Sequence, residues 1–288
     1  MVYIEKRRWK DGVVCPQCSA TQNKITTRVG GFYRCNACDL TFTVRTGTIF
    51  ERSHIPLHKW LYAMYLLVTS RKGISSLQLS KEIGVTQKTA WFMLQRLREA
   101  CGNDDFTLTG TIELDETYIG GLEKNKHASK LLNKGRGSVG KTAVLGMRER
   151  GGRLIASTIE KNNKETIQGA IEKYVEKGST VMTDDHRAYI GLGQKGFTHE
   201  TVKHSSGQYV HGNTSTNGIE SVWAVLKRGV NGVYHHVSSK HLDRYVSEVS
   251  FRLNDGNVER HSLDRMGSLL KMAIGRRLTY ANLIGGTK

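Results

Sequence analysis

TIELDETYIGG at residues 111–121 and TVMTDDHRAY at residues 180–189 are the two stretches that decide the fold of this chain. Each opens on a run of apolar and β-favouring residues, which is the pattern of a buried β-strand. The apolar runs end at an acid, Asp115 in the first stretch and Asp184 in the second. We therefore expect two buried strands, each of which ends in a carboxylate.

The segments around these stretches continue the pattern of an α/β domain. We expect a hairpin of two strands, an amphipathic helix and a further strand at residues 142–147, 154–159, 165–177 and 200–202. A last helix opens near Thr216. Three strands, a helix, a strand and then helices suit a ribonuclease H-like sheet with helices on its faces. In that sheet the first and fourth strands are neighbours, so Asp115 and Asp184 should meet.

A third acid, Glu220, lies on the helix that opens near Thr216, and 35 residues separate it from Asp184. Like charges repel, so a cluster of carboxylates calls for a divalent metal. Mg²⁺ prefers oxygen ligands and binds through a few carboxylates together with a substrate phosphate. Two such ions roughly 4 Å apart can activate a water or a 3′-hydroxyl and stabilise the leaving oxygen. Asp115, Asp184 and Glu220 are thus the predicted catalytic residues and ligands of Mg²⁺ or Mn²⁺.

Lys227 follows Glu220 by seven residues. Two helical turns place both side chains on one face of the helix, so Lys227 is predicted to contact a DNA phosphate. Trp223 lies between them, either as a core anchor or as a platform on which a base stacks. The acids next to the first two candidates, Glu116 and Asp185, leave a one-residue ambiguity, and strand alternation favours Asp115 and Asp184.

Two CxxC pairs precede this region, Cys15-Pro16-Gln17-Cys18 and Cys35-Asn36-Ala37-Cys38, and 16 residues separate them. Two thiolates on a tight turn can hold one side of a tetrahedral Zn²⁺, and a second pair closes the other side. Short strands expected at residues 24–28, 32–34 and 41–44 complete a zinc ribbon. Four cysteine ligands leave no open coordination position, so the predicted zinc is structural. The alternative, a pair of redox motifs, fits the matched spacing less well.

Helical periodicity follows, with helices expected at residues 57–68, 76–83 and 87–100 and a turn at Gly84-Val85-Thr86. This is the layout of a helix-turn-helix. Because the start of the last helix enters the major groove in such motifs, Gln87 and Lys88 are predicted to bind DNA. Arg96 and Arg98 lie further along, where we expect contacts with the DNA backbone or with solvent. The alternative is an ordinary three-helix packing unit.

The charge of the chain agrees with a nucleic-acid partner. There are 43 Lys and Arg against 26 Asp and Glu, which gives a net charge of +17. A chain this basic usually meets a polyanion. No signal peptide opens the sequence, and the longest apolar stretch, residues 60–68, is far too short to span a bilayer. We expect a reducing compartment and no membrane partner.

Together, CPQC, CNAC, LDETYIGG, TDDHRAY and HGNTSTNGIESVWAVLKRGVNGVYHHVS resemble the DDE transposases of bacterial insertion sequences that carry a zinc ribbon and a helix-turn-helix. The resemblance covers about residues 15–255. It implies a metal-dependent recombinase in the cytoplasm, at the nucleoid, that binds terminal inverted repeats, nicks their 3′ ends and joins them to target DNA. Such a protein works as an oligomer of at least two copies. By position, Asp115, Asp184 and Glu220 are its metal ligands and Lys227 its DNA contact.

Within this resemblance the third acid has an alternative, because related proteins can carry Asn there and Asn217 lies one turn before Glu220. The charge of Glu220 and its phase with Lys227 favour Glu220. The expected domains are a zinc ribbon, a helix-turn-helix domain, a ribonuclease H-like catalytic domain and a C-terminal basic tail, at residues 1–50, 51–105, 106–255 and 256–288. The alternative functions are a domesticated DNA-binding regulator and a ribonuclease H-like nuclease that cuts without joining.

Overall fold

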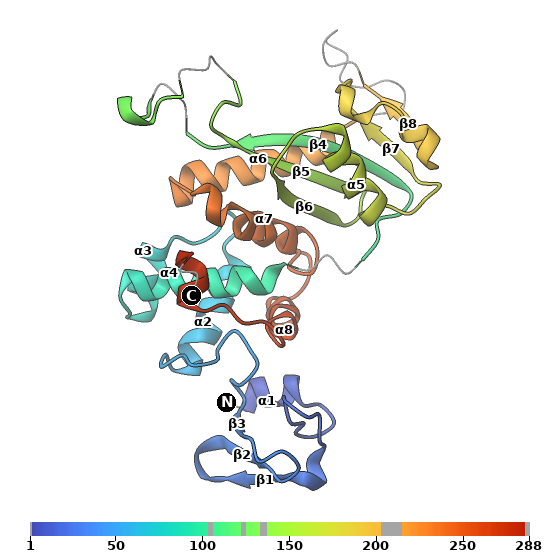
Figure 1. The fold of residues 1–288 in the computed structure, drawn as a ribbon. Coiled ribbons are helices and arrows are strands. Elements are labelled where there is room, and N and C mark those ends of the chain that lie inside the picture. The colour runs from blue at the N-terminus through green and yellow to red at the C-terminus, as the bar shows by residue number, and fades with distance from the viewer. Residues whose placement is uncertain (1, 103–105, 122–124, 133–136, 203–214, 286–288) are drawn as a thin grey trace. The chain divides into compact units, whose positions relative to one another are not determined.

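The computed structural model describes residues 2–102, 106–121, 125–132, 137–202 and 215–285. The chain divides into two compact units (Figure 1). Unit 1 comprises Met1–Cys101 and Asp255–Lys288, and unit 2 comprises Gly102–Asn254. The two units are described separately below.

Unit 1 opens with α1 (Val2–Arg8), which is followed by a small antiparallel sheet in the order β1-β2-β3. Its strands are β1 (Ile25–Arg28), β2 (Phe32–Cys35) and β3 (Thr41–Thr43). Tyr33 and Phe42 stack with 5.6 Å between ring centroids, and Trp9 packs edge-on against Tyr33 at 5.1 Å. The sheet confirms the zinc-ribbon strands expected from the sequence to within one residue at each end.

Three helices continue unit 1, namely α2 (Leu57–Thr69), α3 (Ser76–Ile83) and α4 (Gln87–Cys101). The Ser75 hydroxyl caps α3 by accepting the Gln78 N–H at 3.1 Å. Gly84 ends α3 in the left-handed region at φ 60°, a conformation that glycine adopts without steric cost. The Thr86 hydroxyl then accepts the Thr89 N–H at 3.2 Å in the first turn of α4. These capping contacts build the short turn that the sequence predicts between the second and third helices.

The end of the chain differs from the basic tail expected at residues 256–288. It forms α8 (Ser262–Met272) and α9 (Tyr280–Ile284), and α8 packs against α2 and α4 within unit 1. Met266, Leu269 and Leu270 are buried, because together they form one apolar face of α8. The Arg and Lys residues interspersed there suggest a basic tail, although the segment also carries this short amphipathic pattern.

Unit 2 is built on a mixed five-stranded sheet in the order β6-β5-β4-β7-β8. The strands are β4 (Thr111–Ile119), β5 (Thr142–Glu149), β6 (Leu154–Ile159), β7 (Thr180–Thr183) and β8 (Thr198–Thr201). β4, β5 and β6 pair antiparallel, whereas β4–β7 and β7–β8 are parallel. The predicted neighbourhood of the first and fourth strands is therefore confirmed, and with it the α/β fold class.

Asp115 lies in the middle of β4, whereas the sequence places it at a strand end. β5 pairs with β4 along its whole length, from Ile112 opposite Glu149 to Ile119 opposite Thr142. The residues before the acid are all buried from Ile112 to Leu114, and buried and less buried residues alternate after it, from Glu116 to Ile119. The strand is thus continuous through the acidic pair, because both acids have hydrogen-bond partners, Trp223 for Asp115 and Tyr189 for Glu116.

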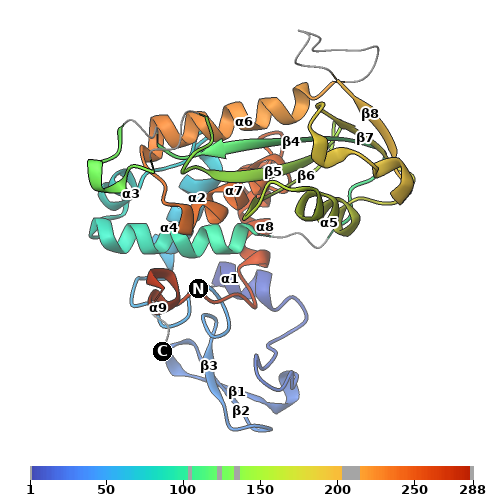
Figure 2. The same cartoon turned by 45° about the horizontal axis from the view of Figure 1, so that its top comes forward.

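Helices cover both faces of the sheet (Figures 1 and 2). α5 (Lys164–Tyr174) contributes Ile167 and Ile171 to the core on one face. α6 (Asn217–Gly229) and α7 (Ser239–Leu253) pack with Val144 and Leu154 in a second core on the other face. Short helical turns connect these elements in the two units, at Gln22–Lys24, Val29–Gly31, Ala128–Lys130, Arg187–Tyr189, Leu192–Lys195 and Val230–Tyr234.

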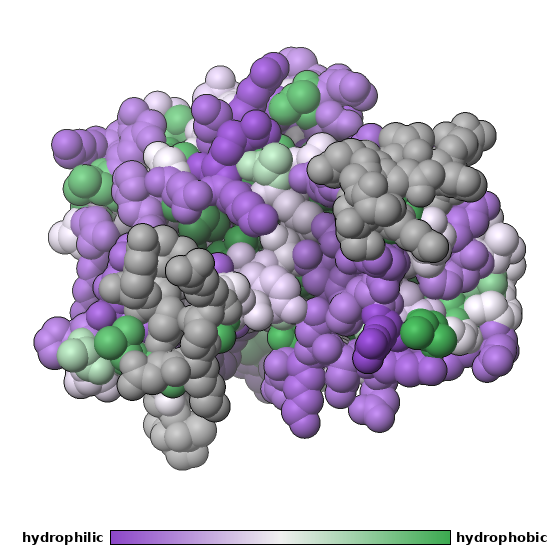
Figure 3. All heavy atoms as spheres, turned by 90° about the horizontal axis from the view of Figure 1, so that it is seen from above, coloured by the Kyte–Doolittle hydropathy of each residue, from purple (hydrophilic) through white to green (hydrophobic). Residues whose placement is uncertain are grey.

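The surface is mainly polar on the face that Figure 3 shows, where hydrophilic residues cover most of the coloured area and apolar residues are scattered among them. Among the helices that the structure describes, none is both long and apolar enough to cross a membrane.

Gly146 of β5 sets the distance between the sheet and α6. A Cβ at this position would lie 2.5 Å from Trp223 Cη2, and the indole is buried in the core. We predict that Gly146→Ala lowers the free energy of unfolding by about 1–3 kcal/mol, as overpacking of a core does. Denaturation of the variant in urea measures the loss.

Gly169→Ala is the matched control, because a Cβ at this position on α5 meets nothing within 4 Å. It should raise stability by up to about 1 kcal/mol, since alanine favours the helix. Equal shifts of the two urea midpoints in the same direction would contradict the packing role of Gly146.

Candidate catalytic site and metal centre

Asp115 lies on the face of the sheet that α6 covers. Its Oδ2 accepts a hydrogen bond of 2.9 Å from Trp223 Nε1, which joins the middle of β4 to the second turn of α6. Burial raises the pKa of Asp115 to about 7, and the neighbouring carboxylates of Glu116 and Asp184 act in the same direction. An ionised Asp115 is therefore unfavourable here unless a cation lies nearby.

Asp184 directly follows β7, and the structure brings it close to Asp115. The parallel register pairs Glu113 with Met182. Asp115 lies two residues after Glu113, and Asp184 lies two residues after Met182. Asp184 Oδ1 accepts the His186 N–H at 3.0 Å, which holds the carboxylate in a tight turn. The two acids that end the predicted apolar runs therefore meet at one point of the sheet.

Glu116 lies next to Asp115 in sequence but takes part in a different group of contacts. Its Oε2 accepts a 2.6 Å hydrogen bond from the buried Tyr189 hydroxyl, and its Oε1 lies 3.6 Å from His186 Nδ1. Burial raises the pKa of Glu116, and the Asp184 carboxylate adds to the increase. Strand alternation therefore directs Asp115 toward Trp223 on α6, whereas Glu116 contacts Tyr189.

Glu220 is half-buried in the first turn of α6, and its Oε1 accepts a 2.9 Å hydrogen bond from Thr216 Oγ1. Lys227, two turns later, and Asn217, the first residue of the helix, are exposed. Across the described ranges, one group of three or more Cys, His, Asp or Glu side chains is placed to hold a single metal ion, and it consists of cysteines. Glu220 thus does not complete a compact three-carboxylate group in this conformation.

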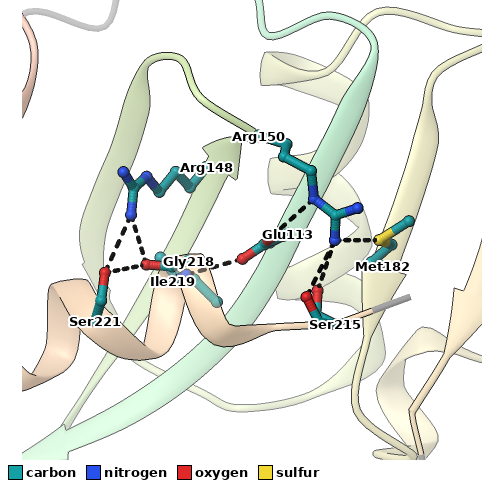
Figure 4. Close-up of polar contacts among 8 residues, drawn as sticks. All are labelled: Glu113, Arg148, Arg150, Met182, Ser215, Gly218, Ile219 and Ser221. Carbon is teal, nitrogen blue, oxygen red and sulfur yellow. Dashed lines mark hydrogen bonds and ion pairs between the residues drawn. The ribbon is translucent and has the colours of Figure 1, made fainter. Parts of the chain in front are cut away.

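A buried polar network fixes the start of α6 against the sheet (Figure 4). Its centre is Glu113, whose side chain is 5% exposed and lies two residues before Asp115 on the same face of β4. Glu113 Oε2 accepts the Ile219 N–H at 3.0 Å, and Oε1 accepts Arg150 Nε at 3.2 Å. A side chain at Gly218 would clash with this carboxylate, so glycine permits the close approach.

Two arginines, Arg148 near the end of β5 and Arg150 just after it, extend the network in Figure 4. Arg150 Nη2 lies 3.2 Å from Ser215 Oγ and 3.2 Å from the Met182 sulfur. Arg148 Nη1 donates to Gly218 O at 2.7 Å and to Ser221 Oγ at 3.1 Å. Side chains from β4, β5 and β7 therefore converge on the segment that carries Glu220.

This network was not predicted from the sequence. The only signal for Glu113 is a charged residue two positions before Asp115, inside a run that is otherwise buried. Arg148 and Arg150 end a strand whose partners are set by the tertiary fold, so no local pattern identifies them.

The four cysteines form the metal centre of unit 1. All four Sγ atoms lie within 4.8 Å of one another, and the Cys15–Cys38 and Cys18–Cys35 pairs are 3.6 Å apart. A tetrahedral zinc with Zn–S bonds of about 2.3 Å has sulfur atoms separated by about 3.8 Å. The arrangement fits a structural Cys₄ zinc site, as the spacing of the two CxxC pairs predicts.

The predicted DNA-reading residues lie at the start of α4. Gln87 and Lys88 are both exposed. Gln87 Nε2 donates to Ser76 Oγ at 2.9 Å, and the Lys88 ammonium lies 5.2 Å from the ring centroid of Tyr280 on α9. The C-terminal segment therefore contacts the helix that a helix-turn-helix would insert into DNA.

Arg96 and Arg98 differ from expectation, since both are buried in unit 1 rather than facing DNA or solvent. Arg96 Nη2 donates to the Glu51 carbonyl at 2.6 Å, and its guanidinium lies 5.6 Å from the centroid of the Trp60 ring. Burial lowers the pKa of Arg96 to about 10. A guanidinium can satisfy backbone carbonyls while stacking on rings, so these residues belong to the core.

Comparison with known proteins gives two family matches. Residues 107–254 match the ISXO2-like transposase domain, and residues 1–41 match the transposase zinc-ribbon domain. An uncharacterized protein in transposable element ISH50 of Halobacterium salinarum is 32% identical over 260 residues, which cover 85% of this chain and 86% of that protein.

Two solved structures show remote similarity. The Mos1 strand transfer complex is 11% identical, with 77% of each chain covered and a TM-score of 0.31. The simian T-cell lymphotropic virus intasome bound to PP2A regulatory subunit B56 gamma is 14% identical, with 69% of this chain and 66% of that chain covered and a TM-score of 0.30.

The charge of Asp115 should make the metal-free protein less stable as the pH rises. Because the pKa is about 7 in the folded state and near 4 when unfolded, the folded state holds the proton more tightly, and stability falls between about pH 4 and pH 7. Asp115→Asn stays neutral and can still accept the Trp223 hydrogen bond. The unfolding free energy of Asp115→Asn minus that of the wild type should therefore increase by about 2–4 kcal/mol between pH 4 and pH 7.

Chemical denaturation of both proteins in chelator at several pH values measures this difference. Asp185→Asn, at the exposed neighbour of Asp184, is the control and should show no comparable growth. If the difference in unfolding free energy between Asp115→Asn and wild type stayed constant with pH, the raised pKa of Asp115 would be wrong.

Loss of one zinc ligand should abolish zinc binding. We expect one zinc per chain in the wild type and none in Cys38→Ser, because three thiolates and a hydroxyl hold the ion far more weakly than four thiolates. Cys101→Ser is the control, since the Cys101 thiol lies in α4 and donates to the Leu97 carbonyl. Atomic absorption on chelator-washed protein measures the content, and full zinc in Cys38→Ser would exclude this centre.

Proposed function

The chain belongs to the ISXO2-like transposase family, and from this premise we propose that it cuts DNA at the ends of a mobile element and joins them to a target. Asp115, Asp184 and Glu220 are the proposed ligands of two Mg²⁺ or Mn²⁺ ions. The observation that carries the proposal is the pair of mutually repelling carboxylates at the β4–β7 junction, where the pKa of Asp115 is raised to about 7.

The donor set fits hard divalent cations, which prefer carboxylate oxygens. Bound there, such ions would activate the attacking hydroxyl or water and stabilise the leaving oxygen of the phosphodiester. The protein orients its own ligands. Trp223 Nε1 fixes one oxygen of Asp115, and the His186 N–H fixes one oxygen of Asp184. Both carboxylates are thereby held in place before any substrate arrives, which reduces the cost of ordering them.

Glu220 has to change its contacts to join the two aspartates. Its carboxylate accepts a hydrogen bond from Thr216 Oγ1, and exchanging a bond to a charged group costs on the order of 1.5–3 kcal/mol. The Glu113–Arg150 network holds the start of α6 while the side chain moves. We therefore assign Glu113 and Arg150 as positioning residues. Asn217, at the first residue of α6, is the alternative third ligand.

The modules of unit 1 would select the DNA. We propose a zinc ribbon in residues 1–50 and a helix-turn-helix in residues 51–105, with Gln87 and Lys88 in contact with terminal inverted repeats. Lys227 on α6 would hold a phosphate near the cut in the catalytic domain, residues 106–255. Two ends must be held together for joining, so the working form is an oligomer of at least two copies.

Two other functions predict different outcomes. A DNA-binding regulator would bind end repeats without cutting, and it would not need all three acids. A nuclease without joining activity would cut duplexes but produce no strand-transfer products. The presence of Asp115, Asp184 and Glu220 together with the family's zinc ribbon favours the transposase.

A strand-transfer assay with an end-repeat duplex and Mg²⁺ or Mn²⁺ tests the proposal. We expect nicked and joined products from the wild type and a loss of at least about a thousandfold for Asp184→Ala, because removal of a metal ligand removes the electrostatic stabilisation of the transition state. Asp185→Asn, one residue away, is the control and should keep its activity. Joining by Asp184→Ala would overturn the assignment, and binding without cutting by wild type would identify a regulator.

The same assay decides the third ligand. Glu220→Gln should abolish both nicking and joining, whereas Asn217→Ala should retain most of each. The reverse pattern would move the third position to Asn217.

A further inference from the structure

The two ends of the chain enclose a basic pocket within unit 1. It lies between α1 and α8, which pack against each other, and has a volume of about 550 Å³. Five cationic side chains and two acidic ones contribute to its lining, namely Arg7, Arg8, Lys10, Arg260 and Lys271 with Asp11 and Asp264. The proposed function gives this pocket no role. We propose that it binds the sugar-phosphate backbone of duplex DNA.

Two of the five cations have structural roles. Arg8 donates to the Val44 and Thr46 carbonyls, both at 2.7 Å, and ties α1 to the zinc ribbon. Arg260 lies 3.4 Å from the Asp255 carboxylate and also contacts Ser268 Oγ at 3.3 Å. These contacts build the walls of the pocket. Asp11 and Asp264 offset two of the five positive charges, so the lining as a whole keeps an excess of positive charge.

Arg7, Lys10 and Lys271 supply that charge. All three are exposed, and in the part of the chain that the structure describes Lys10 and Lys271 form no ion pair. The Arg7 guanidinium lies 4.9 Å from the Tyr3 ring and so close to the backbone of Gly267 that a Cβ there would clash with it. Glycine on α8 thus lets an arginine head group lie against the helix, inside the pocket.

DNA is the occupant that these observations favour. The chain has a net charge of +17, and its lysine and arginine side chains attract the negatively charged phosphates of nucleic acid. The pocket also belongs to the same unit as the zinc ribbon and the helix-turn-helix. Contacts of this kind would position the duplex without reading its sequence. The inference rests on the proposed function, because it assumes that unit 1 binds DNA.

The test is the salt dependence of DNA binding by the full chain with Lys10→Gln and Lys271→Gln combined. Each lost phosphate contact lowers the slope of log affinity against log salt by about one, so we expect a slope lower by about two. Between 50 and 200 mM salt, the wild type should then lose about tenfold more affinity than the variant. The effect should be equal for an end-repeat duplex and an unrelated duplex.

The matched control combines Lys161→Gln with Lys177→Gln, two exposed lysines of unit 2, and changes the net charge by the same amount. Thermal unfolding confirms that each protein is folded. A slope for Lys10→Gln/Lys271→Gln equal to that of the wild type or of the control overturns the pocket proposal alone. Failure of the wild type to bind either duplex would instead overturn the proposed function.

Discussion

A buried carboxylate held beside a second one is the constraint around which the candidate site of unit 2 is built. The parallel pairing of β4 with β7 fixes the backbone so that Asp115 and Asp184 cannot move apart, and the backbone hydrogen bonds of the ladder supply the stabilisation. In the absence of a cation the pKa of Asp115 is raised to about 7, first by burial and then by the neighbouring carboxylates of Glu116 and Asp184. A site that stays strained until a cation arrives binds that cation more strongly than a relaxed surface would.

The surroundings of the two acids keep them oriented rather than relieving their repulsion. Gly146 lets Trp223 approach the sheet, and the indole then donates to Asp115. Glu113 is another carboxylate on the strand that carries Asp115, but it is paired with Arg150 and accepts a backbone N–H from α6. A buried carboxylate with such partners is satisfied, whereas removal of one partner would leave a costly unpaired charge. Structural and candidate catalytic carboxylates thus alternate along one face of β4.

Local sequence patterns made most of the secondary structure and the zinc ribbon predictable. The cysteine spacing gives the zinc ribbon, period-two alternation gives β4, and turn chemistry at Gly84 gives the helix pair. What the sequence could not supply is the partner of each polar residue. Glu113 and Asp115 look alike in the strand, and only the positions of Arg150 and Trp223 distinguish them. Likewise, Arg96 and the basic end of the chain read as surface features, because the rings and helices that bury them lie far away in sequence.

The three proposed ligands also differ in how firmly the fold holds them. Asp115 and Asp184 sit on or directly after strands whose register is fixed by backbone pairing. Glu220 sits in the first turn of a helix, and side-chain contacts from Glu113, Arg148 and Arg150 hold that end in place. Hydrogen bonds that involve charged side chains are individually worth about 1.5–3 kcal/mol and can exchange one at a time, whereas a β-ladder changes register only as a whole. Adjustment to metal and DNA should therefore occur at the Glu220 side chain on α6, with the two strand-borne aspartates serving as the fixed reference.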